Sequence, residues 1–363
     1  MKKLKTLPRP TLCALSCFSA VLVAAVLICA GQAQSKEITD MFGRVFSIAE
    51  KPSKIYSPSP PLTHLLYVID PSMLAGLTSP VRGHEKPYLK KEVLSLPVLG
   101  GWYGQGNTPN IEMVLKVNPD LIILAKFDTV FHSRTNEAIM KILPSPVVSV
   151  NLATLCDYPA AITYLGQLLG REERAGKLAA YARKTLTDME AFTKDISADK
   201  MVSVYYAEGA DGLHTDCDTS VHAQLIPLAG GRNVHSCASP SAYGMEKISM
   251  EQLLMYDPDV ILAFEHSFYR RIFNDSRWQR LRAVQNKRVY LIPNQPFNWF
   301  DRPPSFMRLL GVKWVAGCLY PQHCPVDMVK ETRHFFKLFF DVELTVEEAK
   351  NILGGRSKKK GIR

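Results

Sequence analysis

The sequence repeats one pattern, as NIEMVLKVNPDLIILA at residues 110–125 and as SMEQLLMYDPDVILAF at residues 249–264. Each copy opens on a residue that favours a helix N-cap, Asn110 or Ser249, and continues as a short helix that ends at a Pro-Asp dipeptide. An apolar run typical of a buried parallel strand follows. The repeat therefore predicts two similar α/β units in tandem.

Strand and helix patterns alternate on both sides of each copy, which favours parallel sheets. Residues 171–196 are rich in Ala, Lys and Glu and lack Pro, so they predict one helix of about 24 residues, about 36 Å long. We therefore expect an α/β fold of two parallel-sheet lobes joined by one long rigid helix, with a ligand cleft between the lobes. The expected divisions are a signal peptide at 1–33, an N-terminal lobe at 34–156, a bridging helix region at 157–198, and a C-terminal lobe with extra C-terminal helices at 199–363. Strands are expected at 54–57, 73–78, 120–125, 147–150, 201–207, 259–264 and 288–292, and further helices at 61–68, 133–143, 303–320, 326–340 and 345–353.

Composition and charge exclude several classes of protein. The chain has 363 residues, of which 47% are hydrophobic and 21% charged, unlike a disordered, collagen-like or small disulfide-rich protein. Its net charge of +10 sits at the ends, because residues 1–33 contribute +4 and residues 356–363 contribute +5. The nearly neutral remainder lacks the basic surface of a nucleic-acid-binding protein. Only one long uncharged apolar stretch occurs, so a membrane protein with several spans is excluded.

The N-terminus has the features of an export signal. Lys2, Lys3 and Lys5 precede an uncharged stretch at residues 12–30, and the small residues of Gly31-Gln32-Ala33 follow. We expect cleavage before Gln34 and a periplasmic location. The alternative is a retained membrane anchor, since 19 residues are just enough to span a bilayer. Lipid attachment at Cys29 is disfavoured, because Ile28 stands where a lipoprotein signal carries a small residue.

Export places the remaining cysteines in an oxidising compartment, where disulfides persist. The mature chain keeps five, an odd number, so at least one thiol is unpaired. Cys217–Cys237 and Cys318–Cys324 are the nearest pairs in sequence, and disulfides and buried free thiols are equally compatible with the spacing. No CxxC occurs to indicate a zinc ribbon or a thioredoxin site. The mature cysteines are Cys156, Cys217, Cys237, Cys318 and Cys324.

The order of these segments resembles that of the periplasmic substrate-binding proteins of ABC importers for ferric siderophores, haem and cobalamin. The resemblance covers the mature chain to about residue 320 and rests on the repeat, the long central helix and four further segments. These are TDMFGRVFSIAEKPSKIY (39–56), LIPLAGGRNV (225–234), WQRLRAVQNKRVYLIP (278–293) and NWFDRPPSFMRLLGVKWVAG (298–317). It implies a ligand held between two lobes that move little on binding.

The resemblance also implies a partner, the permease dimer in the inner membrane. Glu112 and Glu251 lie in the first turn of the two repeated helices, where an acid is favourable beside the helix dipole. In the cobalamin-binding relative, the Glu at this place in each lobe faces an Arg of the permease. Two equivalent charges on two lobes suit a two-fold symmetric partner. We therefore expect both residues to dock on the permease, and we expect the binding protein itself to be a monomer.

Candidate ligand-binding residues follow the expected strands, where ligands of parallel α/β sheets bind. Aromatic side chains with a few cations suit a flat, anionic metal chelate. His214 and His266 additionally offer imidazole ligands to a metal. Core packing or a solvated surface are the alternatives for these residues. The set is Trp102, Tyr103, Lys126, His214, His266, Arg270, Trp299 and Arg302.

These features predict a periplasmic substrate-binding component of an ABC importer that captures an iron chelate, with no intrinsic cofactor and no enzymatic activity. No HExxH, GxSxG or GxxxxGK[ST] motif is present. Where the cobalamin-binding relative has Trp at the end of a first-lobe strand, this chain has Ala125 and Lys126, which favours an anionic ligand. Cobalamin, haem, a nickel chelate or molybdate are alternative ligands. An exported α/β enzyme or a metallochaperone is the alternative from another class.

Overall fold

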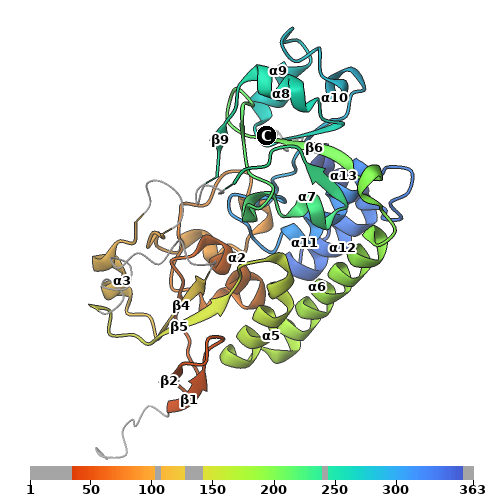
Figure 1. Cartoon of the computed structure of the whole chain (residues 1–363). Coiled ribbons are helices and arrows are strands. Elements are labelled where there is room, and N and C mark those ends of the chain that lie inside the picture. Colours follow the sequence, from red (N-terminus) through yellow and green to blue (C-terminus); the bar gives the residue numbers. More distant parts are fainter. Residues whose placement is uncertain (1–34, 103–107, 127–141, 239–243, 355–363) are drawn as a thin grey trace, which may run out of the picture.

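The computed structural model describes residues 35–102, 108–126, 142–238 and 244–354. The expected signal, residues 1–33, and most of the helix expected at 133–143 lie outside the described residues. Figure 1 shows two lobes, with β4 and β5 in the lower one and β6 in the upper one, and the long helix α6 alongside. In the described part of the chain, no helix is both long and apolar enough to cross a membrane.

The N-terminal lobe is built on a parallel sheet in the order β3-β4-β5. The strand expected at 73–78 forms only two parallel bridges, from Leu74 to Ile55 and from Leu77 to Val98, which widen this sheet. An antiparallel hairpin, β1–β2, precedes it. The elements are β1 (Ser35–Thr39), β2 (Val45–Ala49), β3 (Ile55–Tyr56), α2 (Pro60–Ile69), α3 (Ile111–Val117), β4 (Leu121–Lys126) and β5 (Val147–Asn151), with 3-10 turns η1 (Pro71–Met73), η2 (Lys86–Tyr88) and η3 (Val93–Ser95).

The C-terminal lobe has a parallel sheet in the order β11-β10-β6-β8 and a small antiparallel pair, β7–β9. Three helices, α11, α12 and α13, close the chain as expected. The elements are β6 (Val202–Ala207), β7 (His214–Thr215), α7 (Leu225–Leu228), β8 (Gly231–Asn233), β9 (Glu246–Lys247), α8 (Met250–Tyr256), β10 (Val260–Ala263), α9 (His266–Ile272), α10 (Arg282–Gln285), β11 (Val289–Leu291), α11 (Arg308–Leu319), α12 (Met328–Phe340) and α13 (Val346–Leu353), with η6 (Val221–Ala223).

One long helix connects the lobes as expected, and a second helix packs beside it. α6 (Glu172–Thr193) is the long helix expected from the sequence, and α5 (Tyr158–Leu169) packs beside it after the 3-10 turn η4 (Leu155–Asp157). A further turn, η5 (Ala198–Lys200), leads into the second sheet. Gly170 takes the left-handed conformation, φ 64°, that lets the chain reverse between the two helices.

The sequence repeat is a repeat of structure. Each copy places a helix, α3 or α8, before a central strand, β4 or β10, and each helix is capped by the side chain of Asn110 or Ser249. The Asp of each Pro-Asp dipeptide then accepts hydrogen bonds from a serine at the start of the neighbouring strand. Asp120 accepts from Ser53 at 2.8 Å, and Asp259 accepts from the Ser203 hydroxyl at 2.7 Å. The two lobes therefore share one construction.

The segment between β11 and α11, residues 292–307, joins the lobes, and we call it the β11–α11 loop. Its Phe297 ring stacks on His64 of α2 at 3.7 Å between centroids, and its Gln295 accepts a hydrogen bond from Tyr88 at 2.8 Å. Phe336 of α12 packs edge-on against the same Tyr88 at 5.2 Å. The C-terminal helices thus cover an apolar contact between the lobes, which favours a fixed relative orientation.

A disulfide joins Cys217 to Cys237, with their Cα atoms 5.7 Å apart. Cys156, Cys318 and Cys324 are free, so the second candidate pair, Cys318–Cys324, does not form. The bond closes a loop of about 20 residues, for which chain entropy predicts a stabilisation of about 3 kcal/mol.

We expect a Cys217→Ser/Cys237→Ser variant to lose about 3 kcal/mol of unfolding free energy, because the unfolded chain regains the freedom that the disulfide removes. Urea titration with and without dithiothreitol measures this loss. Cys156→Ser, at an exposed free thiol, is the control and should unfold as the wild type does. A reductant that leaves the wild-type midpoint unchanged contradicts the prediction.

Candidate ligand-binding site

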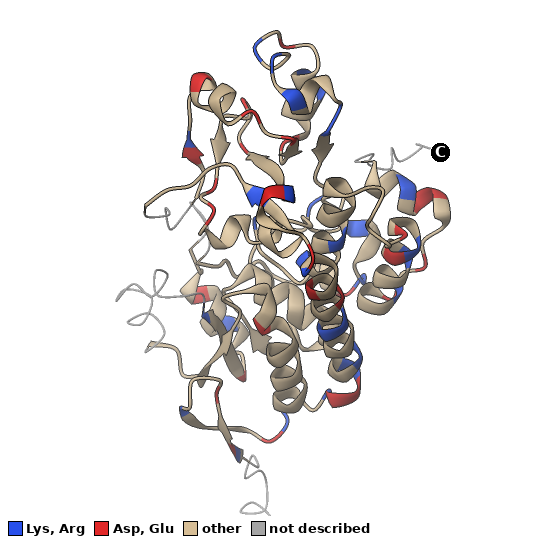
Figure 2. Cartoon of the chain, turned by 45° about the vertical axis from the view of Figure 1, so that its right-hand side comes forward, with Lys and Arg blue, Asp and Glu red and all other residues tan. Residues whose placement is uncertain are grey.

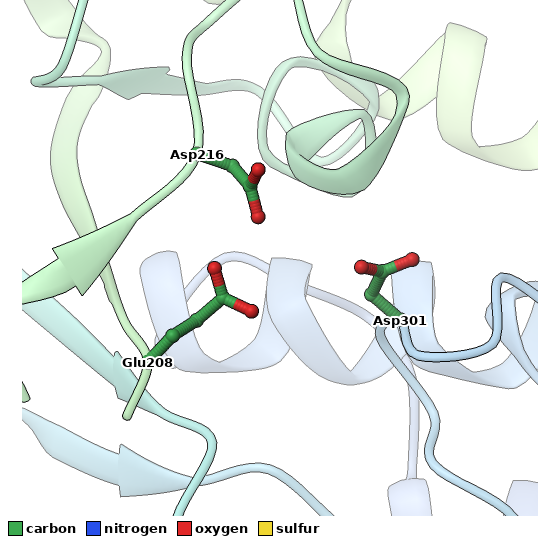
Figure 3. Close-up of side chains that lie close together, drawn as sticks. All are labelled: Glu208, Asp216 and Asp301. Atoms are coloured by element: carbon green, nitrogen blue, oxygen red, sulfur yellow. The ribbon is translucent and has the colours of Figure 1, made fainter. Parts of the chain in front are cut away.

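A buried charge cluster lies at the carboxyl end of β6, where that strand meets β7 and the β11–α11 loop. Figure 3 shows Glu208, Asp216 and Asp301 pointing toward a common space. The Arg302 guanidinium bonds to Glu208 through Nε, and its Nη2 lies 2.8 Å from an Asp216 oxygen. Asp301 lies farther away, 3.8 Å from Nε. All three carboxylates are fully buried, so Arg302 is their principal counter-charge.

The surroundings set the protonation of this cluster. Burial raises the pKa of Asp216 to about 9, and the hydrogen bond and charge of Glu208 act in the same direction. Burial opposes the charge of Arg302, but its hydrogen bond to Glu208 and the nearby carboxylates outweigh that effect and raise its pKa. Arg302 is therefore always charged, and Asp216 holds a proton at neutral pH.

The local backbone is shaped to fit the cluster. Arg302 adopts φ 53°, a left-handed conformation that costs a non-glycine residue about 1–3 kcal/mol and persists where surrounding contacts enforce it. Gly244 lies directly against Asp216, and a Cβ there would fall 1.8 Å from its Oδ1. Only glycine fits at that position.

Three carboxylates within 4.8 Å of one another resemble an oxygen-donor metal site. In this structure Arg302 contacts two of the three carboxylates and lies near the third, so the guanidinium already supplies the positive charge. The cluster therefore holds Arg302 and the β11–α11 loop in place.

Three further polar atoms near Asp301 are buried without a hydrogen-bond partner: Tyr206 Oη, Arg308 Nε and Asp301 Oδ1. The charge of Asp301 acts on both Tyr206 and Arg308. Burial raises the pKa of Tyr206 well above its ordinary value, and the charges of Glu208 and Asp301 act in the same direction, so its hydroxyl keeps its proton. One acceptor, one donor and one hydroxyl suit a bound water molecule.

A small cavity of about 40 Å³ lies in the N-terminal lobe, where Phe297 of the β11–α11 loop meets α2. His64 lines it, and its Nδ1 is buried without a partner. Burial and the charge of Arg82 lower the pKa of His64 to about 3, so this imidazole is neutral. The remaining lining residues are Thr63, Tyr67, Leu74, Leu77, Thr78, Ser79, Val81, Glu85, Leu89 and Val93.

The candidate residues of the N-terminal lobe and Trp299 have different surroundings in the structure. Trp102 is half-buried, and its backbone N–H donates to the Pro58 carbonyl at 3.0 Å. Lys126 ends β4 with its ammonium 4.4 Å above the ring of Phe42. Tyr103 lies outside the described residues. Trp299 is fully buried in the core, which is the alternative given for it and not the ligand-binding role.

The cationic and histidine candidates of the C-terminal lobe lie on three segments, namely α9, β7 and the β11–α11 loop. Arg270 and His266 are exposed on α9. His214 lies in β7 with Nδ1 3.3 Å from the Asp211 carboxylate. Arg302 is held by Glu208 and Asp216 instead of standing as an unpaired cation, which corrects the role expected for it. Among the described residues, the group with metal-ligand spacing contains neither His214 nor His266.

Sequence reasoning missed most of the cluster. Glu208 directly follows a strand pattern, and Asp301 lies in the loop after the last expected strand, which is the one signal available from the sequence. Asp216, Tyr206 and Arg308 carried no such signal, and neither did His222, whose Nδ1 lies 2.6 Å from Asp301 Oδ2.

The two acids expected to dock are placed alike. Glu112 and Glu251 are both exposed in the first turns of α3 and α8. Each helix also exposes a large apolar residue, Leu115 at 43% and Met255 at 80%. In the view of Figure 2, acidic and basic ribbon segments occur in both lobes.

Comparison with known proteins agrees with this architecture. The sequence model described as periplasmic binding protein matches residues 84–296. The chain belongs to the periplasmic binding protein family. An ABC transporter solute binding protein from Sulfurospirillum deleyianum is 38% identical and superposes with a TM-score of 0.83, over 87% of this chain and 98% of that one. The protein is thus a periplasmic substrate-binding component of an ABC importer.

Relatives within this family differ in ligand. The molybdate-binding protein MolA of Haemophilus influenzae is 28% identical over 265 residues, which cover 65% of this chain and 71% of MolA. The Fe(3+)-citrate-binding protein YfmC of Bacillus subtilis is 27% identical over 192 residues, 52% of this chain and 58% of YfmC. Both relatives are named as binding proteins.

Proposed function

We propose that this substrate-binding protein captures a ferric chelate and delivers it to the membrane permease. The observation that carries the proposal is the charge balance at the carboxyl end of the C-terminal sheet. Arg302, the cation expected to grip an anion, is already paired with Glu208 and Asp216. A bare doubly charged oxyanion needs unpaired donors and cations, whereas a metal chelate can use carboxylate and imidazole groups. The Fe(3+)-citrate-binding relative supports the same ligand class.

Molybdate is the second candidate, because MolA matches over a longer part of this chain than YfmC does. The two ligands differ in what they require. Molybdate is a tetrahedral dianion whose oxygens accept hydrogen bonds, whereas a ferric chelate with exchangeable positions can take a protein ligand on its metal.

Metal analysis and ligand titration decide between them. The mature protein, purified from a periplasm, is expected to contain iron and to show the visible absorbance of a ferric chelate. Titration with ferric citrate, haem, cobalamin and molybdate, followed by tryptophan fluorescence, compares the ligands on one sample. Tight molybdate binding without ferric chelate binding overturns the proposal.

We also propose that Glu112 and Glu251 dock the two lobes on the permease. Both are exposed at equivalent places, and each has an exposed apolar neighbour on its own helix, Leu115 or Met255. An exposed charge with an adjacent apolar side chain suits an interface that forms and dissociates in each transport cycle.

A Glu112→Arg/Glu251→Arg variant should lower transport by at least tenfold in vesicles that contain the cognate transporter, because like charges then oppose each other across the interface. Ligand affinity should stay within about twofold of wild type. Glu347→Arg, at an exposed acid in the first turn of α13, is the matched control. Equal transport by both variants contradicts the docking role.

A further inference from the structure

His222 is held in one orientation by a buried carboxylate. Its Nδ1 lies 2.6 Å from Oδ2 of Asp301, which is fully buried. The backbone on both sides is fixed as well: the His222 N–H donates to Ser220 Oγ at 3.2 Å, and the Asp301 N–H donates to Asn298 Oδ1 at 3.0 Å. The imidazole therefore has a defined direction before any ligand arrives.

The other ring nitrogen of His222 is available. Among the described residues, none forms a hydrogen bond with Nε2, and the side chain keeps 14% of its surface exposed. The ring lies near the contact between the lobes, because Gln224, two residues on, accepts a hydrogen bond from the Leu155 N–H at 2.9 Å. Leu155 follows β5 of the N-terminal sheet, so His222 borders the carboxyl ends of strands from both lobes.

The other described histidines near this region lack that combination. His214 has Nδ1 3.3 Å from Asp211, but Asp211 keeps 43% of its side-chain surface exposed, and the His214 Nδ1 makes no hydrogen bond with the described residues. His235 uses both ring nitrogens, toward Tyr256 and Glu246. His64 stacks on Phe297 and buries its Nδ1 in a small cavity. His266 is exposed on α9 with no orienting carboxylate among the described residues. His222 alone among these is both oriented and open on one nitrogen.

We propose that His222 contacts the ligand through Nε2, acting as an electron-pair donor, and that Asp301 is its positioning residue. A carboxylate that accepts from Nδ1–H keeps the proton on that nitrogen and leaves the lone pair on Nε2. Such an atom binds a metal ion or a hydrogen-bond donor and repels an oxyanion. This inference rests on the proposed function and narrows it: the ligand is a ferric chelate that leaves at least one coordination position for the protein.

The test uses ferric citrate, whose iron retains exchangeable positions, and the mature protein. His222→Ala should weaken ferric citrate binding by about tenfold or more. Asp301→Asn should weaken it by about ten- to a hundred-fold, as loss of an orienting carboxylate does at other metal-ligating histidines. Pulsed electron paramagnetic resonance of the bound iron should show coupling to an imidazole nitrogen in the wild type, and none in His222→Ala. His323→Ala, at an exposed histidine between α11 and α12, is the matched control and should behave as the wild type does.

The outcomes separate the two proposals. Wild-type protein that binds molybdate and no ferric chelate overturns the proposed function and, with it, the role of His222. Wild-type protein that binds ferric citrate without nitrogen coupling, and as tightly as His222→Ala does, overturns only the inference. Because His222 is partly exposed, its alanine variant tests the inference even where Asp301→Asn fails to fold.

Discussion

Arg302→Met is expected to destabilise the protein by about 3–5 kcal/mol, the usual loss when one partner of a buried ion pair is removed. Glu208 and Asp301 are fully buried near this guanidinium, and the variant leaves them without their principal counter-charge. Asp216, also buried, loses the hydrogen bond from Arg302 Nη2. Urea unfolding at pH 7.5 measures the loss. The outcome also distinguishes two roles for Arg302. If the guanidinium served only to bind the ligand, its removal would weaken ligand binding and leave the free energy of unfolding unchanged.

The deficit of Arg302→Met should shrink as the pH falls. A buried carboxyl whose folded pKa is raised contributes stability that is fully present below its unfolded pKa and lost as the pH rises through the folded pKa. For Asp216 in the wild type, this window runs from the ordinary value of 3.8 to about 9. Without Arg302, we expect the folded state to favour the protonated forms of Glu208 and Asp301 as well, so their contribution to stability is also lost as the pH rises. The control is Asp216→Asn, which replaces the carboxyl with a neutral group of the same shape. Its free energy of unfolding should be close to that of the wild type at pH 7 and should exceed it as the pH approaches 9.

The repeat allowed much of the fold to be predicted because its signals are local. Helix caps at Asn110 and Ser249, a proline break and an apolar run each act within a few residues, and both copies folded as expected. The long helix at 172–193 was equally clear, since no proline interrupts it. The segment at 73–78 forms isolated bridges instead of a full strand. The sequence could not predict this, because apolar periodicity does not report how many backbone pairs a strand makes.

The site was less predictable because its contacts are far apart in sequence. Arg302 meets Glu208 across 94 residues and Asp216 across 86, and nothing local to any of them records the pairing. The same holds for Cys217–Cys237, where spacing left the disulfide and the free thiols equally open. His222 is likewise separated from its partner Asp301 by 79 residues, so no local pattern records their contact.

Trp299 illustrates the ambiguity of an aromatic residue that follows a strand, since the same sequence position serves a cleft wall or a core. Its side chain is fully buried, and its indole Nε1–H donates to the Gln295 carbonyl at 2.9 Å within the β11–α11 loop. Gly311 of α11 packs on the Trp299 carbonyl so closely that a Cβ there would lie 1.8 Å from the oxygen. The residue therefore anchors the loop to the last part of the core.

Trp299→Ala should accordingly cost about 3–5 kcal/mol of unfolding free energy, through the lost apolar burial and the cavity that remains. Trp299→Phe keeps most of the apolar volume and loses the indole hydrogen bond, so its cost should be smaller. Differential scanning calorimetry of both variants measures the order of effects, and titration below the unfolding transition measures ligand affinity. We expect the folded fraction of each variant to bind ligand within about twofold of wild type, because the indole has no exposed surface to offer a ligand. A Trp299→Ala protein that unfolds as the wild type does but fails to bind ligand would contradict this prediction and indicate that Trp299 belongs to the ligand site.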